Sequence, residues 1–460
     1  SNVITFEEGY EEPEIVDRLT VKVRTKEMNW RLFLYFGGMY ILPAHQIAIP
    51  GERYLREYNW DFLTGSGPYE LASAGDLKKG ESLILTRRHD WWAENEEWGR
   101  NTYNFGKVRF IVIRDVDLEY ERFKKGDLDW FIVRRAQRWV EELPREAVVR
   151  NGWVKMRKIW NQAPQGFSGM AFNQRVPPFD DRRVRLAFAH VFNRERLIER
   201  LFFNQYELIN STEPGRDWGA GDVNPMIRFD PARAAALLAE AGYRERGRDG
   251  YLVGADGKRL EVTLQYGEAS LERVFLVIRD DYEAAGIKFN LELIDASTLI
   301  KKISERQFTI HFQNWGSLLF PNPETSWRSD LADLPANNNL TGFKSERVDE
   351  LLRLYNRALD RAEQKRIVRE IDQIIVSEHP YAFAWYAQYQ RILFWDKFGH
   401  PESYLTRIGQ VPESDMLLLW WWDPEKEAAL AEARSAGRKL PQGPIDVRPW
   451  ARGDEAEPTA

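Results

Sequence analysis

A double proline between a predicted strand and a predicted helix is the feature that most constrains the fold of this chain. The strand ends at Phe172, and Pro177 and Pro178 follow within six residues. Because proline cannot continue a β ladder or the interior of a helix, the chain must turn at this point. Asp180 or Asp181 then stands where a carboxylate caps the first turn of a helix. The segment therefore predicts a strand, a corner and a helix, and we interpret it as the start of a new α/β lobe.

After the corner, apolar residues recur with the period of buried helices. The first helix carries them at the i, i+3, i+4 and i+7 positions of one face, at Val184, Ala187, Phe188 and Val191. Asn193 can start a second helix. No residue of this stretch belongs to a catalytic pattern, so its predicted role is architectural.

Two or more lobes are predicted because the chain is too long for one hydrophobic core. It has 460 residues, whereas a single core stops growing at roughly 250–300 residues. We predict lobe one over residues 1–166 and lobe two over residues 167–390. Residues 391–438 are expected to return to lobe one. Residues 439–460 are rich in proline, glycine and charge, which predicts an extended or disordered tail.

In lobe two, the residues that mark where helices and strands begin and end are clearer than in lobe one. Asp230 and Pro231 mark the start of a helix, with a cap followed by a proline at the first helical position. Residues 262–266 alternate as a strand, residues 271–285 have a helical pattern, and residues 287–293 alternate again. This order predicts a βαβ unit within an α/β lobe.

Composition argues against several classes of function. The net charge of −6 means that the chain lacks the excess of positive charge that is typical of proteins that bind nucleic acid or anionic lipid. The absence of cysteine removes disulfides, thiolate catalysis and cysteine-ligated metals. None of the six histidines has another histidine three or four residues away, so no zinc site is predicted. We expect no metal and no cofactor, while a hydrolase with paired carboxylates stays open because acidic residues are plentiful.

Tryptophan is unusually frequent, with 18 residues among 460. An indole combines a large apolar face with one N–H donor, which suits both protein cores and ligand platforms. Most of these side chains are expected in cores. As a group they favour a protein that holds something with flat faces or an extended chain.

Six phrases of the sequence closely resemble the family 5 extracellular solute-binding proteins, the oligopeptide- and dipeptide-binding components of ABC importers. The phrases occur in the order of the family and cover about residues 60–390: Gly65–Tyr69, Lys125–Asp129, Phe172–Ala189, Phe229–Tyr243, Asn338–Phe343 and Val348–Leu352. Two further phrases, Ser317–Glu324 and Trp421–Lys426, are most similar to the larger peptide- and peptide-antibiotic-binding branch.

The resemblance implies a two-lobed periplasmic-binding-protein-like fold (type II), with the double proline at the entry to lobe two. It implies a non-enzymatic protein, periplasmic or extracellular, that captures peptides between its lobes and delivers them to an ABC permease. Relatives also carry a signal peptide and further N-terminal sequence that completes lobe one. Lobe one is therefore expected to be incomplete here, and a missing N-terminal segment, which could also be a membrane tether, or a second chain is expected to complete it.

The resemblance also implies where ligand binds. Residues 308–323 match a strand and loop that line the cleft in the family, where backbone groups pair with an extended peptide. Leu318 stands at about the position where oligopeptide-binding members often place an aspartate for the ligand's amine, so recognition of a free N-terminus is not predicted. The candidate ligand-binding residues are Asn314, Trp315, Gly316, Ser317, Trp160, Asn161, Arg134, Arg135, Trp385 and Tyr386.

These candidates have alternative roles. Arg134 and Arg135 are either partners of a ligand carboxylate or solvated surface residues. The aromatic and amide candidates near the predicted crossovers between lobes are either ligand contacts or hinge and core residues. For the whole protein, an oligosaccharide-binding member of the same fold is the nearest alternative, and a secreted hydrolase or an interaction partner without ligand is more distant.

Overall fold

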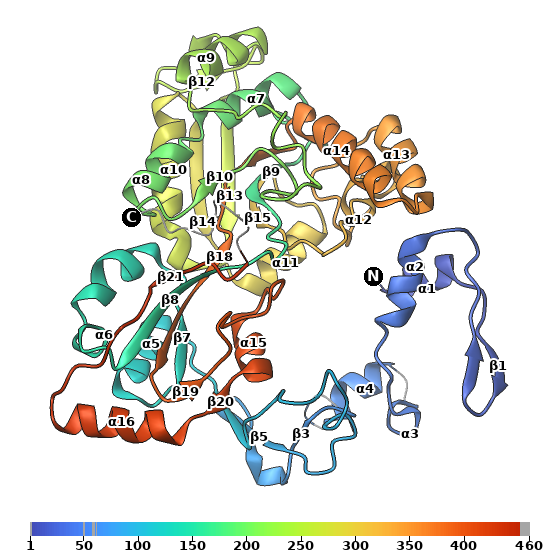
Figure 1. The fold of residues 1–460 in the computed structure, drawn as a ribbon. Coiled ribbons are helices and arrows are strands. Elements are labelled where there is room, and N and C mark those ends of the chain that lie inside the picture. Colours follow the sequence, from blue (N-terminus) through green and yellow to red (C-terminus); the bar gives the residue numbers. More distant parts are fainter. Residues whose placement is uncertain (1, 49–50, 58–59, 61, 451–460) are drawn as a thin grey trace. The chain divides into compact units, whose positions relative to one another are not determined.

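The computed structural model describes residues 2–48, 51–57, 60 and 62–450 (Figure 1). The chain forms two compact units. Unit 1 comprises Ser1–Gly38 and Pro164–Ala387, and unit 2 comprises Met39–Ala163 and Gln388–Ala460. In the described ranges, no helix is both long enough and apolar enough to cross a membrane.

Unit 1 is built around a five-stranded sheet of order β14-β13-β15-β9-β16 (Figure 1). β13 pairs in parallel with β14 and β15, whereas β9 is antiparallel to β15 and β16. The strands of unit 1 are β1 (Glu14–Asp17), β2 (Thr20–Lys22), β9 (Ser168–Phe172), β10 (Glu207–Leu208), β11 (Glu245–Arg246), β12 (Leu252–Val253), β13 (Glu261–Tyr266), β14 (Lys288–Leu293), β15 (Ile310–Asn314), β16 (Tyr381–Phe383) and β17 (Trp385–Tyr386). Its helices are α1 (Asn2–Gly9), α2 (Trp30–Gly37), α7 (Arg182–Val191), α8 (Arg194–Arg200), α9 (Pro231–Glu240), α10 (Glu272–Ala284), α11 (Ala296–Ser304), α12 (Glu324–Trp327), α13 (Glu346–Arg357) and α14 (Arg361–Glu378).

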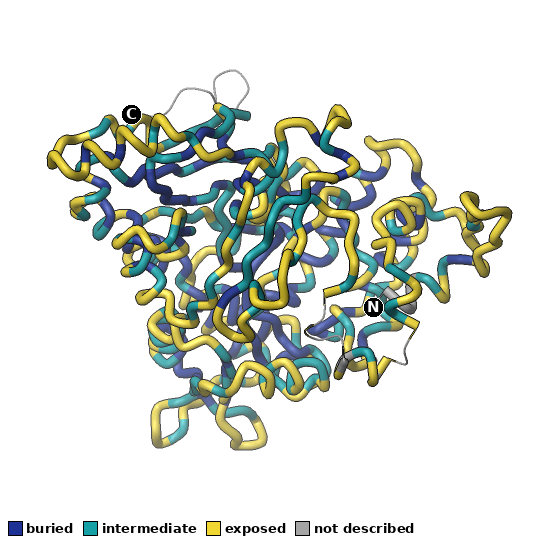
Figure 2. The backbone as a smooth tube through the Cα atoms, turned by 90° about the horizontal axis from the view of Figure 1, so that it is seen from below, coloured by how far each residue is buried: buried dark blue, intermediate teal, exposed yellow. Residues whose placement is uncertain are grey.

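Helices cover both faces of this sheet at β9, an interior strand between β15 and β16 that is buried on both sides. All five residues of β9 are buried. Figure 2 draws the backbone of buried residues in dark blue. Met170 and Phe172 pack in one core cluster with α7, α9 and α10. Ala171 packs in a second cluster with α13 and α14. Side chains alternate along a strand, so neighbouring residues of β9 enter the two cores in turn.

The double-proline corner has the predicted structure. Asp181, and not Asp180, caps α7 by accepting a hydrogen bond from the Arg183 N–H at 2.8 Å. The rings of Phe172 and Phe179 stack with centroids 4.5 Å apart, so the residues on either side of the corner are packed together. The predicted helix start at Asn193 is also confirmed, since that side chain caps α8.

Unit 2 contains a four-stranded sheet of order β21-β8-β18-β7 and a second sheet in which β5 pairs with β3, β4 and β6. Its strands are β3 (Tyr69–Glu70), β4 (Leu77–Lys78), β5 (Ser82–Arg87), β6 (Lys107–Ile111), β7 (Trp130–Ile132), β8 (Val154–Trp160), β18 (Tyr389–Trp395), β19 (Phe398–Gly399), β20 (Trp421–Trp422) and β21 (Asp446–Val447). Its helices are α3 (Ala44–Ile47), α4 (Gly51–Glu57), α5 (Val116–Lys125), α6 (Ala147–Arg150), α15 (Pro412–Leu419), α16 (Pro424–Ser435) and a π-helical turn at Arg138–Glu142.

The N-terminal residues group differently from the predicted lobe one. Ser1–Gly38 belong to unit 1, together with the predicted lobe two, and not with the residues that follow them. The reason is a set of contacts to α13. The Trp30 indole donates a hydrogen bond to the Tyr355 carbonyl oxygen at 2.8 Å, and the Arg31 guanidinium donates to the Asn356 side chain at 2.6 Å.

The predicted tail is attached to unit 2 as far as the structure describes it. Asp446 and Val447 form β21, which pairs in parallel with β8. The Leu440 N–H donates to the Asn151 carbonyl oxygen at 2.8 Å. Residues 451–460 of the predicted tail lie outside the described residues.

Candidate ligand-binding site

β15 leads directly into the segment that the sequence predicts to contact ligand. Asn314 is the last residue of β15 and pairs with Ser168 of β9. The Trp315 N–H donates to the Phe167 carbonyl oxygen at 2.8 Å, so the pairing continues one residue beyond the strand. The Trp315 indole donates to the Tyr381 hydroxyl at 3.0 Å. Backbone and ring together therefore fix the position of Trp315.

Two glycines differ in the space that surrounds them at this segment. Gly166 has a φ of +66°, and a Cβ atom there would lie 2.0 Å from the Trp315 carbonyl oxygen, so only glycine fits. At Gly316, in contrast, no described atom beyond its two chain neighbours lies within 4 Å of the position that a Cβ would occupy. The backbone of Gly316 is thus open to an approaching molecule.

A cavity of about 310 Å³ lies beside this segment. Trp315, Gly316 and Ser317 line it, whereas Asn314 does not. The remaining walls come from four stretches of unit 1, at Phe167, at Thr212 and Glu213, at residues 318–338, and at Val368 and Ile371.

Glu213 is the ionisable side chain of this wall, and the sequence analysis did not identify it. Its carboxylate accepts hydrogen bonds from the Arg216 guanidinium and the Ser317 hydroxyl, each at 2.7 Å. Burial raises the pKa of Glu213 to about 7, against the lowering effects of Arg216 and Ser317. The charge of this carboxylate therefore changes near neutral pH.

The loop that carries Glu213 is held by Asp372 on α14. The Asp372 side chain is fully buried. It accepts hydrogen bonds from the Ser211 hydroxyl at 2.8 Å, the Thr212 N–H and hydroxyl at 2.7 Å, and the Ala220 N–H at 2.8 Å. The Asn224 side chain donates to the same carboxylate at 3.1 Å. A single buried carboxylate thus fixes both ends of the loop.

Two further predicted residues, Trp385 and Tyr386, belong to unit 1. Trp385 packs its ring against Phe202 and Phe312, with centroids 4.7 and 5.8 Å apart, as a core residue would. Tyr386 pairs with Glu207 of β10 and lines a second cavity, of about 450 Å³, whose wall also contains Glu213.

Trp160 and Asn161 lie in unit 2, where both have partners. The Asn161 amide is buried, donates to the Gly409 carbonyl oxygen at 2.8 Å and accepts from the Ala163 N–H at 3.2 Å. The Trp160 ring packs against Tyr389 with centroids 4.9 Å apart. Both side chains thus have contacts within unit 2, and their predicted contact with ligand stays a prediction.

Arg134 and Arg135 follow β7 in unit 2. The Arg134 carbonyl oxygen accepts a hydrogen bond from Arg391 at 2.8 Å. The Arg135 guanidinium pairs with the Asp117 carboxylate at 2.8 Å. Asp117 also accepts from Arg138, so Arg135 belongs to a larger network of ion pairs.

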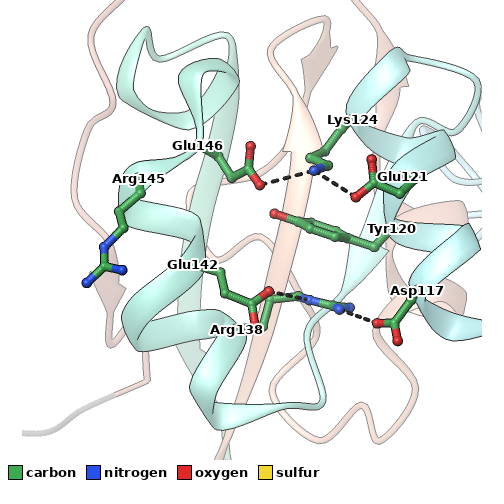
Figure 3. Close-up of a pocket in the computed structure, with 8 residues that line it drawn as sticks. All are labelled: Asp117, Tyr120, Glu121, Lys124, Arg138, Glu142, Arg145 and Glu146. Carbon is green, nitrogen blue, oxygen red and sulfur yellow. Dashed lines mark hydrogen bonds and ion pairs between the residues drawn. The ribbon is translucent and has the colours of Figure 1, made fainter.

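This network lines a cavity of about 470 Å³ in unit 2 (Figure 3). The Tyr120 ring lies between Lys124 and Arg138, whose charged groups are 4.8 and 4.2 Å from its centroid. Lys124 pairs with Glu121 at 2.8 Å and Glu146 at 3.1 Å, as the dashed lines in Figure 3 show. The pairs join α5 to the residues that follow β7, and we interpret them as structural.

A metal site is not evident in the part of the chain that the structure describes. No three side chains of histidine, aspartate or glutamate cluster there in a way that could hold a metal ion.

Comparisons with known proteins find a matching family and related sequences. The family model of the bacterial extracellular solute-binding proteins of family 5, middle region, matches residues 4–337. The probable peptide-binding protein YejA of Agrobacterium fabrum is 26% identical over 408 residues, which cover 80% of this chain and 66% of that protein.

Two solved structures resemble this chain in fold. The oligopeptide-binding protein AppA of Bacillus subtilis, in complex with a nonapeptide, gives a TM-score of 0.73 at 21% identity and covers 90% of this chain and 78% of its own. A periplasmic oligopeptide-binding protein of Thermotoga maritima, bound to mannohexaose, gives 0.69 at 19% identity and covers 87% of this chain and 74% of its own. At these identities the likeness shows a shared fold.

The chain is shorter than its curated relatives. It spans 66% of the length of YejA of Agrobacterium fabrum and the same share of the uncharacterized protein y4wM of Sinorhizobium fredii.

Proposed function

Because the chain belongs to the family 5 bacterial extracellular solute-binding proteins and has their two-lobed α/β fold, we propose that it captures peptides for an ABC importer. YejA of Agrobacterium fabrum and AppA of Bacillus subtilis are named as peptide-binding and oligopeptide-binding proteins. The ligand would be a peptide and the partner a membrane permease. The protein would act outside the cytoplasmic membrane, free or tethered to it.

The open backbone at Gly316 is the observation that supports this proposal most directly. The chain is extended through β15 and Trp315, and it then enters the cavity with no side chain at Gly316. An extended peptide binds such a segment through main-chain groups, which gives affinity without dictating the peptide's side chains. We propose Asn314, Trp315, Gly316 and Ser317 as the peptide contacts.

Isothermal titration calorimetry with a mixed peptide pool tests the function. Peptides should bind, and the melting temperature of the protein should rise as ligand is added, because ligand stabilises the state that binds it. An absence of both heat and thermal shift with every peptide would contradict the proposal.

Substitution of Gly316 by alanine tests the site. The added Cβ would occupy the space beside the proposed peptide backbone, and overpacking of this kind costs about 1–3 kcal/mol, so affinity should fall roughly tenfold or more. Gly67→Ala is the matched control, because that Cβ position also has no described atom within 4 Å. Equal peptide affinities of the two variants would exclude Gly316 as a contact.

An oligosaccharide is the second candidate ligand. The Thermotoga maritima neighbour was solved with mannohexaose, and the partly buried Trp315 ring lines the cavity, where an indole can stack on a sugar. Quenching of tryptophan fluorescence by gluco- or manno-oligosaccharides, but not by peptides, would favour this ligand over the first.

We infer that the protein has no enzymatic activity, since its family is a solute-binding one. Turnover of a labelled peptide or glycan that is lost when one carboxylate is replaced would overturn this inference. The predicted ligand contacts in unit 2, the capture of peptide between two lobes and the additional N-terminal segment stay predictions.

A further inference from the structure

Arg216 holds the backbone of the segment that follows Gly316. Its guanidinium donates to the Leu318 carbonyl oxygen at 3.0 Å and to the Leu319 carbonyl oxygen at 2.6 Å. It also donates to the Ser317 hydroxyl at 3.1 Å. One arginine thus contacts three consecutive residues that lie about a hundred positions away in the sequence.

Leu318 and Leu319, the two residues after Ser317, are not buried in a core. Their side chains are 57% and 44% exposed, so they do not anchor the segment. Gly316, directly before them, has no side chain and can adopt many backbone conformations. Polar contacts to their backbone and to the Ser317 hydroxyl therefore contribute to the position of residues 317–319.

Glu213 completes this arrangement. Its carboxylate accepts from both Arg216 and the Ser317 hydroxyl at 2.7 Å, so it links the arginine to the side chain of the segment. The side chains of Glu213 and Arg216 are each only 12% exposed. Hydrogen bonds between charged groups in such a dry environment are stronger than on the surface.

The loop that carries Glu213 and Arg216 is attached to α14. Glu213 follows two residues, Ser211 and Thr212, that donate to the buried Asp372 carboxylate. Arg216 is followed by Ala220, whose N–H donates to the same carboxylate. Because Asp372 lies within α14, these donors attach the loop that carries Glu213 and Arg216 to that helix.

We propose that Glu213 and Arg216 are positioning residues of the ligand-binding segment, which hold residues 317–319 in the conformation that accepts a peptide. This inference rests on the proposed function, since it assigns the residues that give the proposed peptide contacts their geometry. Neither residue is required to touch the peptide.

The proposal predicts a dependence on pH. The charged and titratable groups that face Glu213 are Arg216 of its own loop, Asp372 of α14 and Tyr355 of α13. Burial raises the pKa of Tyr355 above its ordinary value of 10. Glu213, with a pKa of about 7, changes charge near neutrality. Because burial raises this pKa, the packed segment binds the proton more tightly than an opened segment would, so protonation favours the packed segment and ionisation at higher pH loosens it.

Two measurements on the full chain test the proposal: hydrogen exchange at residues 315–319, corrected for intrinsic rates, and peptide affinity by calorimetry, both at pH 5.5 and 8.5. Wild-type protein should exchange more slowly and bind more tightly at pH 5.5 than at pH 8.5. Glu213→Gln, which stays neutral, should show at both pH values the exchange of the wild type at pH 5.5. Its peptide affinity at pH 8.5 should be about tenfold higher than that of the wild type, equivalent to about 1.4 kcal/mol.

Asp217→Asn is the matched control, because it removes one negative charge from the same loop while Asp217 is 70% exposed and pairs with Lys365. It should behave as the wild type. Arg216→Lys provides a second variant that keeps the charge but lacks the planar guanidinium that contacts all of these acceptors, and it should loosen the segment and weaken peptide binding at both pH values.

The outcomes separate the two proposals. If the wild type binds no peptide, the proposed function fails, and the exchange measurement still tests whether Glu213 and Arg216 hold the segment. If the wild type binds peptide while Glu213→Gln and Arg216→Lys match it in exchange and affinity, the positioning role is overturned and the function stands.

Discussion

At the scale of single residues, Asp372 is a buried carboxylate that several distant donors depend on. A fully buried carboxylate that accepts hydrogen bonds from Ser211, Thr212, Ala220 and Asn224 is satisfied only as long as all of these donors are in place. In the sequence it is one of many acidic residues on a helix. Its role comes from donors about 150–160 positions away, which no local pattern reveals.

We therefore expect Asp372→Ala to destabilise the protein strongly. The substitution leaves buried donors without an acceptor, so the free energy of unfolding should fall by about 3–5 kcal/mol. Urea unfolding measures this change. Glu363→Ala is the control on the same helix, because Glu363 is exposed, and a change within about 0.5 kcal/mol is expected. Similar losses for both variants would contradict the role of Asp372.

Glu213 should also leave a signature in the pH dependence of stability. Its folded pKa of about 7 is above its ordinary value of 4.5, so the folded state binds the proton more tightly than the unfolded state. The contribution of Glu213 to the free energy of unfolding is therefore at its maximum below pH 4.5. It falls as the pH rises to 7, by about 3 kcal/mol at one pKa unit per 1.36 kcal/mol, and is constant above.

Comparison of the wild type with Glu213→Gln isolates this effect from other titrating groups. The difference between their free energies of unfolding should change between pH 4.5 and 7 and stay level from pH 7 to 8.5. A difference that is constant over the whole range would show that the carboxylate titrates normally.

At the scale of elements, α2 shows how the N-terminal residues join unit 1. Trp30 lies edge-on to Phe320 and Tyr355, with ring centroids 5.6 and 5.5 Å apart. Arg31 pairs with Glu324 at the start of α12. The contacts thus join α2 to α13 and to the stretch that follows the proposed ligand-binding segment.

Trp30→Ala should release this element. Loss of the indole removes its hydrogen bond to the Tyr355 carbonyl oxygen and its ring contacts, and a Trp→Ala change of a packed residue costs about 3–5 kcal/mol. Limited proteolysis should then cleave within residues 1–38 faster, while residues 164–387 stay intact. Phe33→Ala is the control, since Phe33 lies on the same helix but is 78% exposed. Equal cleavage of both variants would argue against the attachment.

At the scale of the whole molecule, the comparisons confirm the family and the two-lobed α/β fold that the sequence predicted. The family model matches residues 4–337, and the fold of AppA extends over 90% of the chain. The division into units is the feature that differs, because Ser1–Gly38 group with Pro164–Ala387. The chain therefore passes between the units three times, after Gly38, Ala163 and Ala387.

The sequence by itself determined the features that depend on near neighbours. Helix caps such as Asp181 and Asn193, the proline corner and the alternating strands β13 and β14 involve residues a few positions apart, and all were predicted. The segment around Trp315 was also identified from sequence, through its resemblance to the family.

The tertiary structure alone decided which side chains support that segment. Glu213, Arg216 and Asp372 give no motif, because their partners lie 101 to 161 residues away along the chain. The attachment of α2 likewise depends on contacts across 325 residues. Short-range steric rules fix where helices and strands begin, whereas burial and pairing of polar groups are properties of the folded chain and exist only once distant elements have packed.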